Sequence, residues 1–312
     1  MNIQQLEYIV ALDTHRQFVK AAESCFVTQA TLSMMVKKLE DELGIIIFDR
    51  SKQPILPTAI GQKIIDKARI TLREINELRA IAKDDHTNLE GHIRIGIIPT
   101  LAPYLLPLFL EKYLKDYPKI KLSISELTTT TITERLIQDR IDIGILAIPL
   151  NNPALEEYPM FSEKLLGFVG PTEDKLLKNY IAPEDIDTER LLLLEEGHCL
   201  RSQMMNLCAL QKKSTKYGNF EYEAGSIESL INITEINNGI TIVPELATLH
   251  FSKARKNQLR TFIPPVPIRE IGLVTSKYFY KQKFLKTIES CIKESVQPHL
   301  QAIDSEILKV NP

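Results

Sequence analysis

Two cysteines in one short stretch, Cys199 and Cys208, are the residues of this 312-residue chain whose type and spacing best suit chemistry. The reactive form of a cysteine is its thiolate and not its thiol, so a reactive cysteine needs neighbours that favour its anion. His198 precedes Cys199, Arg201 follows it, and a helix is expected to begin just after Cys199. Each feature brings positive charge or a helix N-terminus towards the sulfur. The stretch therefore predicts thiol chemistry at Cys199.

Plainer interpretations of these cysteines stay open. Two cysteines nine residues apart in a cytosolic protein are usually reduced thiols with no special role. A metal site made from His198, Cys199 and Cys208 lacks a visible fourth ligand and a CxxC pair, so we predict neither a metal nor a cofactor. Cys25 and Cys291 fall on expected helices and are interpreted as packing or surface thiols.

The composition is that of an ordinary globular protein, with 44% hydrophobic and 25% charged residues. The net charge of −2 gives no global field towards nucleic acid or an anionic membrane, so any such contact needs a local patch. No apolar run approaches the roughly 18 residues of a membrane span, and the start of the chain does not resemble a secretory signal. We therefore expect a cytoplasmic protein that makes no membrane contact and folds as two or three compact units.

Three short helices are predicted within residues 1–58, because apolar residues recur there at helical spacing. The third helix is expected to begin near Thr28, a good N-cap residue, and to end at Gly44. A short break at residues 26–28 separates it from the second helix, which is typical of a helix-turn-helix unit. The extended stretch at residues 45–58, with Arg50 near its tip, is predicted to form a wing.

The outward face of the third helix indicates DNA binding. Small and polar side chains come first along it, and two lysines follow before any acid, which suits a helix whose first half enters a major groove. A solvated helix face is the plainer alternative. Residues 1–60 hold six Lys and Arg against seven Asp and Glu, so affinity must come from charge placement and from two copies binding together. The predicted DNA-contacting residues are Thr28, Gln29, Thr31, Ser33, Lys37, Lys38, Arg50 and Thr58.

A dimerising linker helix is predicted over residues 59–90. No Gly or Pro occurs from Gln62 to Glu90, and a thin apolar stripe runs through Ile64, Ala68, Leu72, Ile75, Leu78 and Ala82. A helix with so narrow a stripe has no core of its own, so we expect it to pair with a second copy.

Beyond Gly91, strands alternate with helices, which is typical of parallel-sheet α/β units. We expect two lobes, residues 91–164 plus 268–312 and residues 165–267, with a sensor site in the cleft between them. The predicted helices follow residues 99, 131, 200 and 225, and the predicted strands cover residues 92–99, 119–127, 141–148, 165–169, 191–195, 219–223, 239–244 and 271–276.

The chain resembles the LysR-type transcriptional regulators, which join a winged helix-turn-helix to a two-lobed, periplasmic-binding-protein-like α/β sensor domain. Their DNA-binding motif is similar to TQATLSMMVKKLEDELGIIIFDR (28–50) followed by PTAIG (57–61). The peroxide-sensing branch of that family resembles the chain in NIQQLEYIVAL (2–12), IGIIPTLAPYLLP (95–107) and LLLLEEGHCLRSQMMNLC (191–208). The chain departs from the family pattern at Ala30, Ile60 and Ser202.

The resemblance implies a peroxidatic Cys199, a resolving Cys208, and a redox-active disulfide between them that forms through a sulfenic acid. It also implies a peroxide pocket made by Thr100, Thr129 and His198 with a thiolate-stabilising Arg269. The partners that it implies are promoter DNA, hydrogen peroxide, RNA polymerase, further copies in a homodimer or homotetramer, and a thiol reductant such as glutaredoxin or thioredoxin.

A helix over residues 200–208 would separate the two sulfurs by about 13 Å. A disulfide needs Cα atoms within about 7 Å of each other, so it cannot form unless that helix unwinds. Closing so small a loop is worth roughly 2–3 kcal/mol, which is enough to shift a balanced equilibrium.

The predicted function is a transcriptional activator of oxidative-stress genes, not an enzyme. The alternatives are a LysR-type regulator that binds a small metabolite between the lobes and, disfavoured by the helix-turn-helix, a thiol peroxidase.

Overall fold

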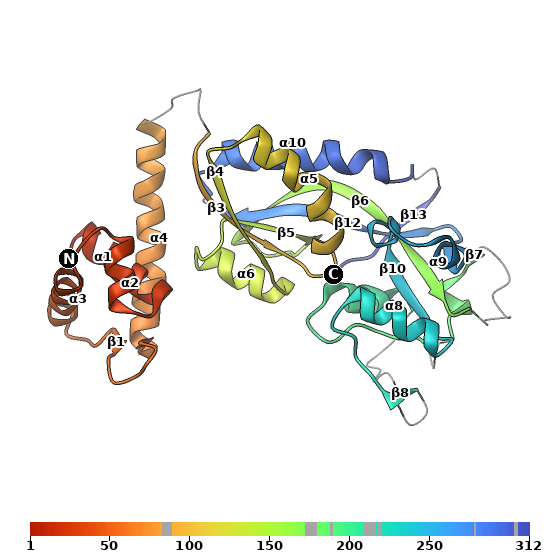
Figure 1. The fold of residues 1–312 in the computed structure, drawn as a ribbon, viewed down its shortest axis with the longest axis horizontal. Helices are drawn as coiled ribbons and strands as arrows, with labels where there is room; N and C mark the ends of the chain where they lie inside the picture. Colours follow the sequence, from red (N-terminus) through yellow and green to blue (C-terminus); the bar gives the residue numbers. More distant parts are fainter. Residues whose placement is uncertain are drawn as a thin grey trace. The chain divides into compact units, whose positions relative to one another are not determined.

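The computed structural model describes residues 1–82, 89–171, 180–187, 190–208, 216–217, 220–277, 279–302 and 305–312. The chain divides into two compact units, Met1–Asn88 and Leu89–Pro312, and each has its own hydrophobic core (Figure 1). Within these ranges, no helix combines the length and the apolar character that a membrane crossing needs.

The first unit contains the predicted helix-turn-helix and wing. Thr28 caps the third helix by accepting a hydrogen bond from the Thr31 backbone N–H at 3.2 Å, and Gly44 ends it in the left-handed conformation. Both predicted helix ends are therefore confirmed. The elements of this unit before the linker are α1 (Ile3–His15), α2 (Phe18–Ser24), α3 (Gln29–Leu43) and the antiparallel hairpin of β1 (Phe48–Asp49) and β2 (Leu56–Pro57).

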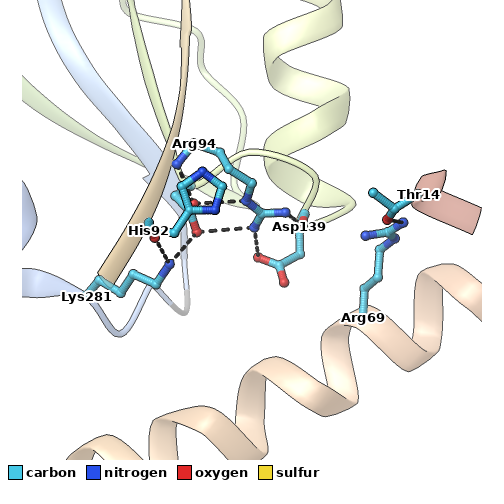
Figure 2. Close-up of polar contacts among 7 residues, drawn as sticks. Thr14, Arg69, His92, Arg94, Asp139 and Lys281 are labelled. Atoms are coloured by element: carbon cyan, nitrogen blue, oxygen red, sulfur yellow. Dashed lines mark hydrogen bonds and ion pairs between the residues drawn. The ribbon is translucent and has the colours of Figure 1, made fainter. Parts of the chain in front are cut away.

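The linker helix α4 (Ala59–Ala82) begins tightly against the wing. A Cβ atom on Gly61 would lie 2.0 Å from the carbonyl oxygen of Ile47, so only glycine fits at this crossing. Ile65 and Ala68 are buried in the core of the first unit, and the Arg69 guanidinium donates to Asp13 at 2.8 Å. Figure 2 shows a further bond from Arg69 to the Thr14 hydroxyl.

Only part of the apolar stripe of α4 is available for pairing with a second copy, which corrects the expectation that the whole stripe pairs. Its first half packs on the helix-turn-helix core, whereas Leu78, further along, is 68% exposed. The prediction of helix up to Glu90 is wrong at Leu89 and Glu90, which are not helical. Residues 83–88 lie outside the described part of the chain.

One nine-stranded sheet runs through the described part of the second unit, in the order β4-β3-β5-β12-β6-β11-β7, with β10 also on β6 and β13 also on β12. Its strands are β3 (Gly91–Ile97), β4 (Ile120–Glu126), β5 (Ile143–Ile148), β6 (Leu155–Val169), β7 (Tyr180–Ile181), β10 (Ile240–Pro244), β11 (Leu259–Phe262), β12 (Val266–Ser276) and β13 (Ile307–Lys309).

The sheet is mixed and not wholly parallel, which corrects the sequence prediction. β3, β4 and β5 are parallel neighbours, whereas β6 and β12 are antiparallel to each other. The predicted strand at residues 165–169 is the end of the much longer β6, which pairs with β12 up to Lys164 and with β10 from Leu165. The long strands β6 and β12 therefore connect the parts of the sheet. They pair with each other, β6 continues to pair with β10, and β12 also pairs with β5.

Helices cover both faces of the first part of this sheet (Figure 1). α5 (Ala102–Asp116) and α10 (Gln282–Val296) pack together on one face, and α6 (Thr129–Ile137) packs on β5, β6 and β12. Further along the chain, α8 (Ile227–Ile236) packs on β10 and β6. The short elements are η2 (Pro183–Asp185), η3 (Glu245–Thr248), α9 (Lys253–Asn257), η4 (Gln297–His299) and the hairpin of β8 (Lys216–Tyr217) and β9 (Phe220–Glu221).

Two predicted strands differ from the structure. Residues 191–195 form no strand and make only isolated bridges, at Leu191 to Ile240 and at Leu194 to Ala224. The strand predicted at residues 219–223 is reduced, among the described residues, to the two residues of β9.

A charged cluster fixes the start of β3 to the chain before α10 (Figure 2). Arg94 donates to Asp142 from Nε at 3.0 Å, and Lys281 donates to Asp142 at 3.1 Å and to the His92 carbonyl at 3.0 Å. Burial alone would raise the pKa of Asp142, but the hydrogen bonds and positive charges of Arg94 and Lys281 hold it below its ordinary value. Because these charges neutralise one another, we interpret the cluster as a structural one that stabilises the packing of these segments.

Candidate functional site

The two cysteines of interest stand at opposite ends of one helix, α7 (Cys199–Leu207). Cys199 is its first residue, after His198 at the N-cap, and Cys208 is its C-cap. Both cysteines are free thiols. The rise of an α-helix separates these ends by about 13 Å, as expected from the sequence. The cysteines cannot share a metal ion, and no group of His, Cys, Asp and Glu in the described residues could hold one.

Cys199 lies in a buried but polar environment. Its residue is 7% exposed, and burial raises the pKa of the thiol. The positive charge of Arg269, a hydrogen bond from the Thr129 hydroxyl and the backbone N–H groups at the start of α7 all act to lower that pKa. Burial therefore opposes ionisation of the thiol, while groups that stabilise its anion are already in position.

Arg269 is held by two partners within this site. Its Nε donates to Glu163 Oε1 at 2.9 Å, and its Nη1 donates to the Thr100 hydroxyl at 3.1 Å. Nη2 also donates to the Thr100 carbonyl at 3.2 Å. Both charged side chains are completely buried. Arg269 thus comes from β12, and Thr100 comes from the loop before α5.

Thr129 is the first residue of α6, next to the N-cap Thr128. The Thr128 hydroxyl is engaged with Thr131, at 2.9 Å from its hydroxyl. Thr129 Oγ1 is buried and has no well-aligned hydrogen-bond partner within the described ranges, although it lies close enough to Cys199 to affect its pKa. A buried hydroxyl without a well-aligned partner is unusual, and this one lies beside the Cys199 thiol.

Arg201 acts differently from the sequence expectation, whereas the place of His198 in a peroxide pocket stays a prediction. Arg201 donates to the Leu194 carbonyl and pairs with Glu223 at 3.0 Å, so it anchors α7. His198 is buried with its Nε2 3.5 Å from Glu195. The cation that acts on the Cys199 thiol is Arg269, which comes from another part of the chain.

Cys208 has a less polar environment. It is half-buried against the core of the second unit, and burial alone raises the pKa of its thiol to about 11. The residues that follow it, 209–215, lie outside the described part of the chain. Gln203, midway along α7, is fully buried and donates to the Val310 carbonyl at 2.7 Å, which ties the helix to the chain after β13.

The predicted DNA-contacting residues of the first unit divide into two groups. Thr28, Gln29, Lys37 and Lys38 are exposed on α3, and Thr31 and Ser33 are half-buried on it. Arg50 is engaged with Glu40 at 2.8 Å, and the Thr58 hydroxyl accepts from the Gly61 N–H at 2.9 Å to cap α4. The structure therefore gives Arg50 and Thr58 roles in the fold.

Two buried carboxylates were missed by the sequence analysis. Glu163 orients Arg269, and Glu40 accepts from the Ile47 and Phe48 backbone N–H groups, at 2.8 and 3.1 Å, as well as from Arg50. A Glu within an alternating strand or on a helix gives no local sign of burial, so no sequence signal marked either residue.

Comparisons with known proteins cover both units. Residues 3–62 match the family described as bacterial regulatory helix-turn-helix protein, lysR family, and residues 86–296 match the LysR substrate binding domain. The DNA-binding transcriptional dual regulator OxyR of Escherichia coli (strain K12) is 36% identical over 277 residues, which are 88% of this chain and 89% of that protein.

Two further relatives cover nearly the whole chain. The hydrogen peroxide-inducible genes activator of Haemophilus influenzae is 33% identical over 303 residues, which are 97% of this chain and 100% of that protein. The structure of a full-length OxyR variant from Pseudomonas aeruginosa aligns with a TM-score of 0.82 at 29% identity, covering 94% of this chain and 98% of that one.

Proposed function

The chain belongs to the LysR family of bacterial transcriptional regulators, and we propose that it activates oxidative-stress genes when hydrogen peroxide oxidises Cys199. The observation that carries this proposal is the buried Cys199, acted on by Arg269 and the Thr129 hydroxyl, at the opposite end of α7 from Cys208. The name of the Haemophilus influenzae relative agrees with it.

The chemistry proceeds in two steps. The Cys199 thiol first gives up its proton, the thiolate then attacks one peroxide oxygen, and the O–O bond breaks. The departing hydroxide takes up a proton and leaves as water, and the sulfur is left as a sulfenic acid. Arg269 and Thr129 stabilise the developing charge and orient the peroxide, and Thr100 is held beside Arg269 for the same purpose. The Cys208 thiol then attacks the Cys199 sulfur, releasing a second water and forming the disulfide.

The second step requires α7 to unwind, because the helix keeps its ends about 13 Å apart. Unwinding breaks the contacts that anchor the helix, namely Arg201 with Glu223 and Gln203 with Val310. Oxidation thereby becomes a change in the packing of the second unit, which we propose alters subunit pairing in a homodimer or homotetramer. A dithiol reductant of the glutaredoxin or thioredoxin class would restore the thiols by exchange.

In the first unit we propose that α3 enters the major groove of promoter DNA and that the oxidised form recruits RNA polymerase. The exposed Lys37 and Lys38 support this placement, as does the absence of an acid before Asp41 on the exposed face of that helix, since Glu40 is buried. Reversing both lysine charges should weaken binding and reduce its salt dependence, whereas Lys67→Glu on α4 should have a much smaller effect. Affinity that survives the double reversal would exclude this orientation of α3. A role on promoter DNA implies a cytoplasmic location.

Non-reducing peptide mapping tests the sensing proposal. Brief exposure of the purified full chain to a small excess of peroxide should produce a peptide that links Cys199 to Cys208, and dithiothreitol should remove it. Cys25 and Cys291 should remain thiols under the same conditions and serve as internal controls. An unmodified Cys199 would contradict the proposal.

The match to the LysR substrate binding domain supports a second candidate, a regulator whose effector is a small metabolite. Calorimetry with the Cys199→Ser variant separates the two. A metabolite regulator keeps its effector binding and its promoter response in that variant, whereas a peroxide sensor loses its response.

A further inference from the structure

Glu163 is the most completely enclosed acidic residue near the sulfur site, and none of the steps above uses it. It lies on β6 with its side chain fully buried. One carboxylate oxygen lies 2.9 Å from both Nε and Nη2 of Arg269, and the other accepts from the Leu246 backbone N–H at 2.9 Å. Glu163 therefore holds Arg269 on one side and is itself held by the backbone on the other.

Burying such an ion pair contributes little to stability on balance. The desolvation of two charges roughly offsets their attraction, and well-packed apolar residues often do as well or better. A pair placed away from water is better explained by the orientation that it imposes. Two N–H groups on one edge of a guanidinium fix its plane, because the group is flat and rigid.

The fixed plane of Arg269 has a direct consequence for the site. With Nε and Nη2 directed to Glu163, Nη1 is directed to the Thr100 hydroxyl at 3.1 Å, and the positive charge acts on the Cys199 thiol. A guanidinium without its carboxylate partner could rotate and still form hydrogen bonds with Thr100. The bonds to Glu163 fix the guanidinium from the β6 side, and those from Nη1 and Nη2 to Thr100 fix it from the loop before α5.

We propose, on the basis of the peroxide chemistry above, that Glu163 is a positioning residue that holds the Arg269 guanidinium in the orientation in which it serves Thr100 and Cys199. It acts through Arg269 and touches neither sulfur nor peroxide. The arrangement resembles a catalytic triad in its logic, since a buried carboxylate orients the group that assists the nucleophile.

Replacing Glu163 by Gln separates orientation from charge. The variant leaves Arg269 without a counter-charge, so the Cys199 thiol should ionise about one pH unit lower. The guanidinium is also less fixed, so the rate of sulfenic acid formation at pH values where the thiol is fully ionised should fall by at least about tenfold. A general loss of structure would not combine a more acidic thiol with a slower reaction.

The matched control is Glu245→Gln. Glu245 is also a buried acid whose two oxygens accept backbone N–H groups, from Lys164 at 3.3 Å and Gln301 at 3.0 Å. The Glu245 variant should change neither the ionisation midpoint nor the limiting rate. Glu163→Asp restores the charge but shortens the side chain, so its midpoint should return to the wild-type value while its rate stays reduced.

Both quantities can be measured in the full chain. Thiolate absorbance, taken as the difference between each variant and the same variant with Cys199→Ser, gives the midpoint, and dimedone trapping in a Cys208→Ser background gives the rate. Burial and Glu228 keep the Tyr104 hydroxyl neutral by raising its pKa, and every variant retains the other nearby charges. These other groups are Arg269, His198, Glu195, Arg201 and Glu228.

The outcomes separate this inference from the function it rests on. A wild-type Cys199 that does not react with peroxide would overturn the proposed function itself. A reactive wild type together with a folded Glu163→Gln variant of unchanged midpoint and unchanged rate would overturn the role of Glu163 alone. If Glu163→Gln does not fold, Glu163→Asp decides, because a limiting rate equal to those of the wild type and Glu245→Gln would exclude a positioning role.

Discussion

The two ends of α7 place chemically identical thiols in different surroundings. At the first end, burial raises the pKa of Cys199 while Arg269, Thr129 and the backbone N–H groups oppose it. At the second end, burial raises the pKa of Cys208, and among the described residues no opposing group acts on it. The difference assigns the two thiols an order of reaction. Cys199 is equipped to meet the peroxide, whereas Cys208 becomes reactive only after α7 has unwound and exposed it.

The strongest test of this order replaces one thiol at a time. Cys199→Ser should abolish every peroxide-dependent change, because none of the described residues around Cys208 stabilises its anion. Cys208→Ser should still form a sulfenic acid at Cys199, detected by mass spectrometry as a dimedone adduct, but no internal disulfide. Oxidation of Cys208 at the normal rate in the Cys199 variant would refute the proposed order.

Removing the ion pair between Arg269 and Glu163 should have the next largest effect on the rate of oxidation. Replacing Arg269 and Glu163 together by Met avoids an unpaired buried charge and so keeps stability close to that of the wild type. Loss of the cation raises the pKa of Cys199 further and removes charge stabilisation, so the peroxide rate should fall on the order of a hundredfold. Stopped-flow oxidation measures the rate, and alkylation of Cys208 should be unchanged in the same variant.

Thr129→Val should slow oxidation on the order of tenfold without lowering stability. The Thr129 hydroxyl has no well-aligned partner within the described residues, so its removal costs no strong hydrogen bond while depriving the peroxide of a donor. Thr131→Val, two residues along, is the control, because it loses the bond to Thr128 without touching Cys199. Equal oxidation rates in the two variants would remove Thr129 from the site.

Gln203→Leu should shift the equilibrium between the two thiols and the disulfide by a smaller factor. The variant loses the bond from Gln203 to the Val310 carbonyl, worth about 1 kcal/mol, so unwinding α7 becomes easier. The equilibrium in a glutathione redox buffer should move towards the disulfide by roughly fivefold. An unchanged equilibrium would mean that this contact survives oxidation.

The smallest expected effect concerns alkaline stability. The pKa of Cys208 is about 11 in the folded chain against 9.0 as its ordinary value, so the unfolded chain ionises first. The stability that this thiol contributes is complete below pH 9.0 and is lost as the pH rises to about 11. The free energy of unfolding, measured by urea titration across that pH range, should fall less steeply for Cys208→Ala than for the wild type.

Local signals in the sequence predicted the elements that carry the chemistry. Thr28 and Gly44 gave the ends of α3 because capping depends only on neighbouring residues. The spacing of Cys199 and Cys208 gave their separation because the helical rise is the same in every protein. The same reasoning wrongly predicted that Arg201 stabilises the Cys199 thiolate. Closeness in sequence to Cys199 does not decide which partners a side chain binds, and Arg201 binds Leu194 and Glu223.

The sequence by itself therefore determined the helix-turn-helix, the wing and a helix with a thiol at each end. Only the tertiary structure decided which groups surround each thiol. The charge of Arg269 acts on Cys199, and Glu163 holds Arg269. This arrangement depends on the antiparallel register of β6 and β12, in which residues 163 and 269 are direct partners. That register depends on pairing between strands more than a hundred residues apart in the chain, and no local propensity encodes it.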